Sequence, residues 1–152
     1  MPSIKLKLYE YYQLDSEING SINSQTGDII RKGLLTEKLN LVTKYWLTDL
    51  SKHIAAEKAI IEDLKIELIK KYGKETEQGI SLPIYIPEEK DKDGKVIKPA
   101  ELNPDYIKFE EEFNILLQEE KELDYHDFKL EDFKNIETSD NYTVFYKLIQ
   151  ID

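Results

Sequence analysis

Residues 36–73 read TEKLNLVTKYWLTDLSKHIAAEKAIIEDLKIELIKKYG, and this stretch decides the fold that we expect for the chain. It holds no proline, and its single glycine is the last residue. Its apolar side chains recur at the spacing of one helix face: Leu39, Val42, Trp46, Leu50, Ile54, Ile61, Leu64, Leu68 and Tyr72. The pattern predicts one amphipathic helix, roughly 55 Å long from its residue count.

The ends of this stretch carry residues that favour helix ends. Thr36 suits the N-cap position. Lys70 and Lys71 place positive charge at the negative end of the helix dipole, and Gly73 can adopt the left-handed conformation that often ends a helix. We therefore predict a helix over residues 36–73, with Trp46 buried where the helix meets the C-terminal segment.

Composition bounds the remaining possibilities. The chain has 152 residues, of which 40% are hydrophobic and 34% charged, so we expect a single domain, 1–152, with a small core. It has no cysteine, which excludes disulfides, a thiol nucleophile and zinc–thiolate sites. No apolar run approaches the roughly 20 residues that cross a bilayer, so no membrane association is expected.

The net charge of −10 is unevenly distributed along the chain. Residues 1–100 are neutral, whereas residues 101–152 hold 15 acidic side chains and 5 basic ones. Such a surface repels phosphate and disfavours direct binding of nucleic acid. A solvated acidic face that aids solubility is the first interpretation, and a basic protein partner or DNA mimicry are the alternatives.

The N-terminal segment, residues 1–35, is predicted to combine a strand, a short helix and a small hairpin. Residues 4–18 fit an extended start followed by helical turns that end at Asn19-Gly20. Turn residues 25–28 predict a hairpin within residues 21–33. Three rings in the segment, Tyr9, Tyr11 and Tyr12, are candidates for core or interface packing.

Residues 80–98 are predicted to form a β arm. Ile80, Leu82, Ile84 and Ile86 alternate with other residues, among them Tyr85, and residues 95–98 form a short return strand. Pro83 confines the first strand to a sheet edge. The arm either pairs with another chain or folds back on its own helices. Asp91, Asp93 and Gly94 resemble only part of a calcium loop, so we interpret them as a solvated turn.

A second helix is predicted over residues 103–121, with Asn103 as N-cap and Pro104 in its first turn. Its apolar face would pack antiparallel on the long helix as a helical hairpin. The acidic C-terminal segment, residues 122–152, suggests a strand over 122–129, a helical turn over 130–133, and a final helix or strand capped by Ser139 or Asp140.

No motif for catalysis is found. His53 has Glu57 one turn later rather than a second histidine, and His126 is flanked by too few convergent ligands to hold a metal. The chain lacks a nucleophile elbow and a nucleotide-binding glycine loop. We therefore expect no enzyme activity, no catalytic residues, no cofactor and no metal.

Four short motifs stand out along the chain from the long helix onward. They are Tyr45-Trp46-Leu47 with Leu50, residues 68–73 (LIKKYG), residues 113–117 (FNILL) and residues 129–132 (KLED). In their order they resemble an uncharacterised family of small tailed-bacteriophage proteins. The resemblance covers roughly residues 40–150 and implies a phage protein without catalytic residues to transfer; the hairpin of residues 21–33 looks like an insertion.

Together these features predict an α+β fold: a long antiparallel helical hairpin with short β-hairpins at its tip and base. The expected function is that of a non-enzymatic structural protein, a subunit of a ring or connector in the head-tail or tail region of the virion. It would be made in the host cytoplasm and would bind itself and other phage structural proteins. The alternatives are a soluble phage regulator that binds a basic host protein through the acidic third, and a small metal-dependent enzyme.

Overall fold

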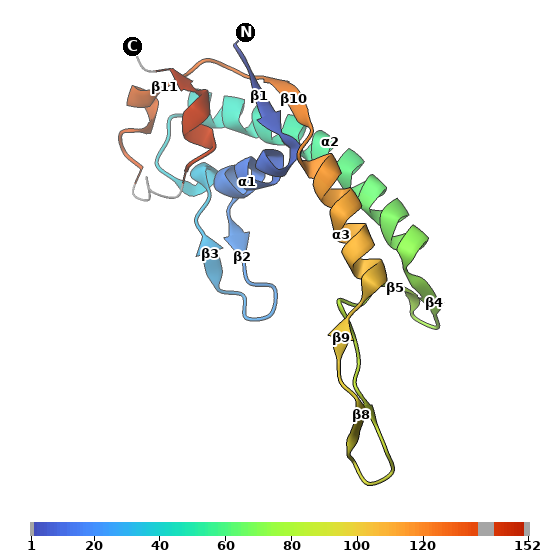
Figure 1. Ribbon diagram of the computed structural model, residues 1–152. Helices are drawn as coiled ribbons and strands as arrows, with labels where there is room; N and C mark the ends of the chain where they lie inside the picture. Colours follow the sequence, from blue (N-terminus) through green and yellow to red (C-terminus); the bar gives the residue numbers. More distant parts are fainter. Residues whose placement is uncertain (1, 137–141, 151–152) are drawn as a thin grey trace. The chain divides into compact units, whose positions relative to one another are not determined.

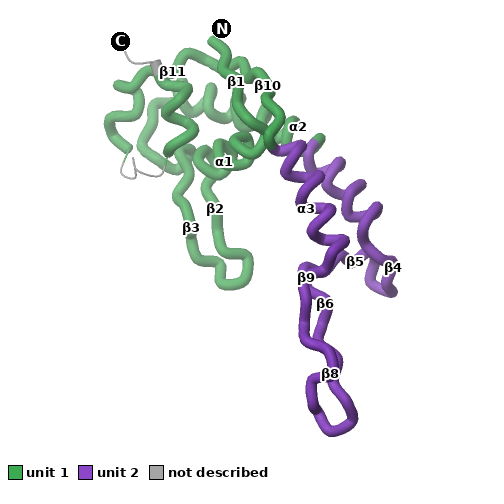
Figure 2. The backbone as a smooth tube through the Cα atoms, viewed as in Figure 1, with its two compact units in different colours: residues 1–60, 118–152 green, residues 61–117 purple. Residues whose placement is uncertain are grey.

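The computed structural model describes residues 2–136 and 142–150. They fall into two compact units, coloured separately in Figure 2. Unit 1 contains residues 1–60 and 118–152, and unit 2 contains residues 61–117. The helix α2, Leu41–Tyr72, contributes its first part to unit 1 and its second part to unit 2. The expectation of a single domain stays a prediction.

Unit 1 begins with β1 and α1, as the N-terminal sequence predicts. Besides the first part of α2, its elements are β1 (Ser3–Lys7), α1 (Leu8–Asn19), β2 (Ser21–Ile22), β3 (Ile29–Arg31), η1 (Leu34–Thr36), β10 (Glu120–Asp124), β11 (Phe128–Lys129), η2 (Leu130–Phe133), η4 (Phe145–Leu148) and β12 (Ile149–Gln150). Strand β1 pairs antiparallel with β10, β2 with β3, and β11 pairs parallel with β12 (Figure 1). The predicted extended start, helix and hairpin within residues 21–33 are confirmed.

The core of unit 1 joins α1, α2 and the C-terminal segment. Its α2 side chains are Leu47, Leu50 and Ile54, all fully or almost fully buried. Val42, which the sequence pattern placed on the buried face, is 67% exposed. Trp46 is half-buried at the margin of the core and stacks on His126, with ring centroids 4.3 Å apart and planes 1° from parallel. The expectation of a buried Trp46 is therefore met only in part.

Three buried glutamates of unit 1 hold the C-terminal segment in place. The carboxylate of Glu17 is fully buried and accepts the backbone N–H groups of Val144 and Phe145, at 3.2 and 3.1 Å. Glu10 accepts a hydrogen bond from the Lys147 ammonium at 2.7 Å. The third glutamate is Glu37, whose Oε1 accepts the hydroxyl of Tyr142 at 3.3 Å.

Unit 2 contains the second part of α2, a series of two-stranded ribbons and one further helix. Its elements are β4 (Lys74–Thr76), β5 (Gly79–Ser81), β6 (Tyr85–Ile86), β7 (Glu89–Lys90), β8 (Val96–Lys98), β9 (Glu101–Leu102) and α3 (Pro104–Leu117). The antiparallel ribbons are β4–β5, β6–β9 and β7–β8. Within this unit, Glu112 of α3 accepts the Tyr72 hydroxyl at 2.8 Å and the Lys71 ammonium at 3.1 Å.

The predicted long antiparallel helical hairpin is wrong. The described residues mix helices with short strands, but α3 has only 14 residues against 32 in α2. The first part of α2 buries its apolar side chains in unit 1, in a core shared with α1 and the C-terminal segment. The amphipathic stripe therefore has different partners along its length, and periodicity alone cannot reveal this. The predicted placement of short β-hairpins at the tip and base of that helical hairpin is therefore wrong as well.

The helix boundaries also differ from the prediction at three ends. Helix α2 begins at Leu41 rather than after Thr36, which lies in η1. The side chain of Asn40 caps this start by accepting the N–H of Thr43 at 2.8 Å. Helix α3 begins as predicted and ends at Leu117 rather than at residue 121. The last described residues form η4 and β12 rather than one regular helix, and the proposed caps Ser139 and Asp140 lie outside the described residues.

We predict that Glu17→Ala lowers the free energy of unfolding by about 3 kcal/mol. The substitution leaves two buried N–H groups without the charged acceptor that they have in the native chain. Urea denaturation would measure the loss. The control is Gln13→Ala, a half-buried residue of α1, which should change stability by less than about 0.5 kcal/mol. Equal losses in both variants would contradict the anchoring role of Glu17.

Acid should weaken unit 1 through Glu10. Burial alone would raise the pKa of its carboxyl, but hydrogen bonds from the Lys147 ammonium and the Lys7 N–H outweigh it and lower the pKa below the usual 4.5. A lowered folded-state pKa gives stability that is complete above the unfolded-state value and is lost as pH falls through the folded-state value. The denaturation midpoint of the native chain should therefore fall as the pH is lowered from neutral to below 4.5. In Glu10→Gln, which lacks this carboxyl, the midpoint should fall less steeply over the same pH range.

Candidate interaction surfaces

The eight residues predicted for an interface divide between the two units. Tyr9, Tyr11 and Tyr12 lie on α1 in unit 1. The others, Ile80, Leu82, Ile84, Tyr85 and Ile86, lie in unit 2. The two groups therefore belong to separate surfaces.

The three tyrosines have different surroundings. Tyr11 is a core residue whose hydroxyl donates to the carbonyl of Lys121 at 3.1 Å. Burial, with a smaller effect of the nearby Glu57 carboxylate, raises the pKa of this phenol to about 12. The ring of Tyr12 is half-buried and has the Lys58 ammonium 5.0 Å from its centroid. Tyr9 is 41% exposed, so its ring offers the largest free surface of the three.

The predicted strand over residues 80–86 is divided in the structure. Its start, in β5, pairs with β4, whereas its end, in β6, pairs with β9. Pro83 lies between the two strands and has no N–H to donate, so a continuous ladder cannot pass through it. The predicted return strand forms β8, but its partner is β7. The turn between β7 and β8 is closed by the Asp91 carboxylate, which accepts the N–H groups of Asp93 and Lys95, each at 2.9 Å.

We use the name arm for residues 79–102. Its base surrounds an apolar cavity of about 500 Å³, lined in part by Leu82, Ile86 and Pro104. Asn103, which is buried, joins the base to α3: its side-chain amide donates to the Pro83 carbonyl at 2.9 Å, and its side-chain oxygen accepts the N–H of Asp105 at 3.1 Å. The predicted N-cap is thereby confirmed, and the same side chain also fixes the start of the arm.

The part of the arm from Ile84 to Leu102 is highly exposed, and its β7–β8 pair is the outer ribbon. Its large apolar side chains are about half exposed or more, at Ile84, Tyr85, Val96, Ile97 and Leu102. Within unit 2 the ribbons β6–β9 and β7–β8 extend away from the N-terminal end of α3, where Figure 1 labels β9 and β8. Each ribbon in this part has two strands, so its outer edges carry backbone groups that another strand can pair with.

Unit 1 has two further exposed apolar groups that the sequence analysis did not select. Ile22, Ile29 and Ile30 protrude from the β2–β3 hairpin. Leu41, Val42 and Tyr45 are exposed at the start of α2. Isoleucines that flank turn residues are a sequence signal that could have indicated the first group. The sequence could not indicate the second group, because its exposure depends on which face of α2 the core covers.

The titratable groups considered for chemistry lie near the surface of unit 1. The Nδ1 atom of His53 is 2.9 Å from the backbone oxygen of Asp49 and 3.6 Å from its carboxylate. Glu57 forms an ion pair with Lys121 rather than with His53. Within residues 2–136 and 142–150, no group of three histidine, aspartate or glutamate side chains is arranged to hold a metal ion. No helix in these residues combines the length and apolar character that a membrane crossing needs.

Searches against protein-family models, curated proteins and solved structures found no match to this chain.

Asn103→Ala should loosen the base of the arm without unfolding α3. The variant loses the N-cap and the hydrogen bond to Pro83, so amide protection over residues 105–108 should fall roughly tenfold. Hydrogen exchange measured by NMR would test this. The control is Asn114→Ala, an exposed residue within α3. Unchanged exchange in Asn103→Ala would show that the side chain does not fix the junction.

Proposed function

We propose that this chain is a non-enzymatic structural subunit of a bacteriophage virion, part of an oligomeric ring or connector in the head-tail or tail region. The observation that carries the proposal is the arm of unit 2, whose exposed apolar side chains lie on ribbons with free edges. The viral context of the proposal comes from the sequence motifs that resemble those of small tailed-phage proteins. Copies of the same chain and other virion proteins are the proposed partners.

Strand addition is the mode of assembly that fits the arm best. An incoming strand would satisfy the free backbone groups at an edge of β6–β9 or β7–β8. The side chains of Tyr85 and Ile97, 60% and 67% exposed, would be covered in the same step. Burial of apolar area then supplies the binding free energy, and the backbone ladder fixes the register.

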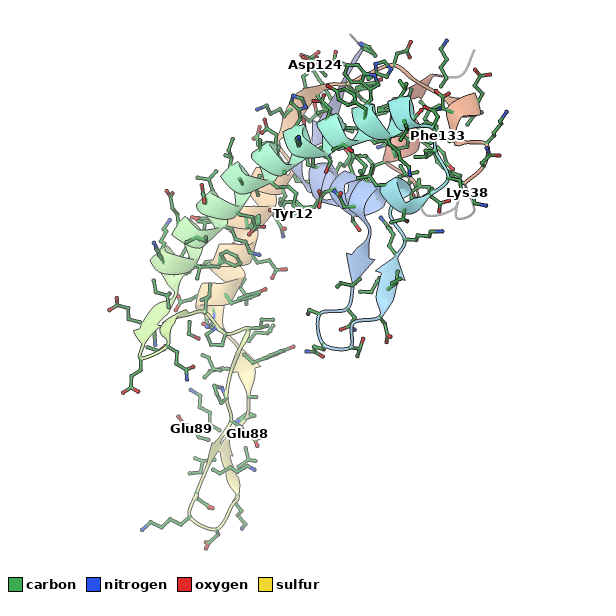
Figure 3. All side chains as sticks on the ribbon, turned by 180° about the vertical axis from the view of Figure 1, so that it is seen from behind. Tyr12, Lys38, Glu88, Glu89, Asp124 and Phe133 are labelled. Carbon is green, nitrogen blue, oxygen red and sulfur yellow. The ribbon has the colours of Figure 1, made fainter. Side chains whose placement is uncertain are left out.

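The charges of the arm favour ordered pairing over aggregation. Strand β7 is Glu89-Lys90 and β8 ends in Lys98, and ion pairs join Lys90 to Glu88 and Lys98 to Glu101. These side chains are exposed, so each ion pair adds little to stability. Charged residues on a strand edge do, however, penalise pairing in the wrong register. Figure 3 labels Glu88 and Glu89 on this ribbon.

Removal of the outer ribbon should abolish self-assembly and leave the helices folded. The variant replaces residues 88–99 by Asn-Gly, a two-residue turn that keeps the β6–β9 pair. Circular dichroism should show unchanged helicity, and light scattering should show that native oligomers become monomers. A native chain that is itself monomeric and absent from purified virions would contradict the proposal and favour a soluble regulator.

Point variants give a matched version of the same experiment. Ile97→Lys places a charge on the arm, and Ile115→Lys places the same charge on α3 at almost equal exposure, 67% against 68%. Only the first should impair oligomer formation and incorporation into virions in a complementation assay. Equal effects of the two variants would indicate a general loss of solubility or stability and would argue against assembly through the arm.

A further inference from the structure

A groove in unit 1 combines an aromatic lining with carboxylates. It has a volume of about 420 Å³ and lies between one face of α2 and the strand β10 with the residues that follow it. Trp46, Asp49 and His53 line the groove from α2, where their spacing of three and four residues places them on one helix face. Asp124 and His126 line it from the other side, and Figure 3 labels Asp124 in this region.

The lining offers flat aromatic surface beside the carboxylates. Trp46 and His126 are stacked in parallel, which fixes both rings at the wall of the groove. Tyr11 also lines the groove, but its side chain is buried and its hydroxyl donates to the Lys121 carbonyl, so it supports the wall of the groove rather than offering ring surface. The lining is therefore well suited to a ligand that is planar and apolar on its faces.

The charge of the groove is negative. Glu57 is already paired with Lys121, and Glu122 accepts a hydrogen bond from the Ser3 hydroxyl at 2.8 Å, so both carboxylates already have partners. Among the described residues, the partner of the Asp49 carboxylate is the His53 imidazole, at 3.6 Å. Asp124 lies opposite Ser3 in the ladder, and in the described part of the chain no cation forms an ion pair with it. Two carboxylates, one from each wall, thus remain for a cationic ligand.

We propose that this groove binds an arginine side chain presented by a partner protein. The guanidinium is planar, so it can lie against aromatic rings while its edge donates hydrogen bonds to Asp49 and Asp124. A lysine ammonium matches the charge but not the flat shape. The negative charge of the groove disfavours the phosphate groups of nucleic acids. The inference concerns unit 1 alone and does not depend on the proposed assembly through the arm.

Binding of a peptide to the intact chain tests the proposal. The probe is a short glycine–serine peptide with three arginines, and its control carries citrulline, which is neutral and nearly isosteric, at the same positions. Trp46 is the only tryptophan, so its emission reports on the groove, and calorimetry detects binding even if the emission stays constant. The arginine peptide should bind with a dissociation constant below about 1 mM. Absence of binding, or equal binding of the citrulline peptide, would overturn the proposal.

Charge-neutralising variants localise the binding. Asp124→Asn and Asp49→Asn should each weaken binding of the arginine peptide about tenfold, since each removes one charged acceptor. The matched control is Glu119→Gln, which removes the same charge from an exposed position outside the groove. All three residues are at least partly exposed, so the variants should fold, and circular dichroism checks this. Equal weakening by Glu119→Gln would reduce the effect to general electrostatic attraction and overturn the assignment.

Discussion

Unit 1 depends on the two hydrogen bonds that the buried carboxylate of Glu17 accepts from the C-terminal segment. A charge removed from water is tolerated only when hydrogen bonds replace its hydration. The two N–H groups at Val144 and Phe145 provide this replacement, and they come from a segment more than a hundred residues away in the chain. Because Phe145 and Leu148 are fully buried, the core is complete only after that segment has docked. Helix α1 and the C-terminal segment therefore share one core.

The acidic character of the chain has different physical roles in different places. Glu10, Glu17 and Glu37 are buried, and each holds part of the C-terminal segment through a hydrogen bond or ion pair. Asp124 is exposed beside an aromatic lining, where an uncompensated carboxylate favours a cationic ligand. Net charge alone does not distinguish the two roles, since burial and hydrogen-bond partners decide whether a carboxylate stabilises the fold or remains available for binding.

The two units differ in how completely they cover their apolar side chains. Unit 1 encloses aromatic residues such as Phe128, Phe133 and Phe145 in edge-to-face and tilted contacts, with centroids 5.1–6.0 Å apart. In the arm of unit 2, by contrast, two-stranded ribbons leave isoleucine, valine and tyrosine side chains in water. A ribbon of two strands is barely stable in water by itself. The arm is therefore the part of the molecule that would gain most from a partner.

The sequence by itself determined the local elements. The start of α3 at Asn103-Pro104, the extended start before α1, the hairpin of β2 and β3 and the helicity of residues 41–72 all follow from caps, turns and periodicity, which act over a few residues. Only the tertiary structure decided that α2 buries Leu47 rather than Val42, that β1 pairs with β10, and that residues 80–86 divide between two strand partners. It also brought Asp49 and Asp124 to one groove and placed Tyr11 in the core. The physical reason is that burial and strand pairing depend on contacts between distant segments, which a local pattern permits but does not choose.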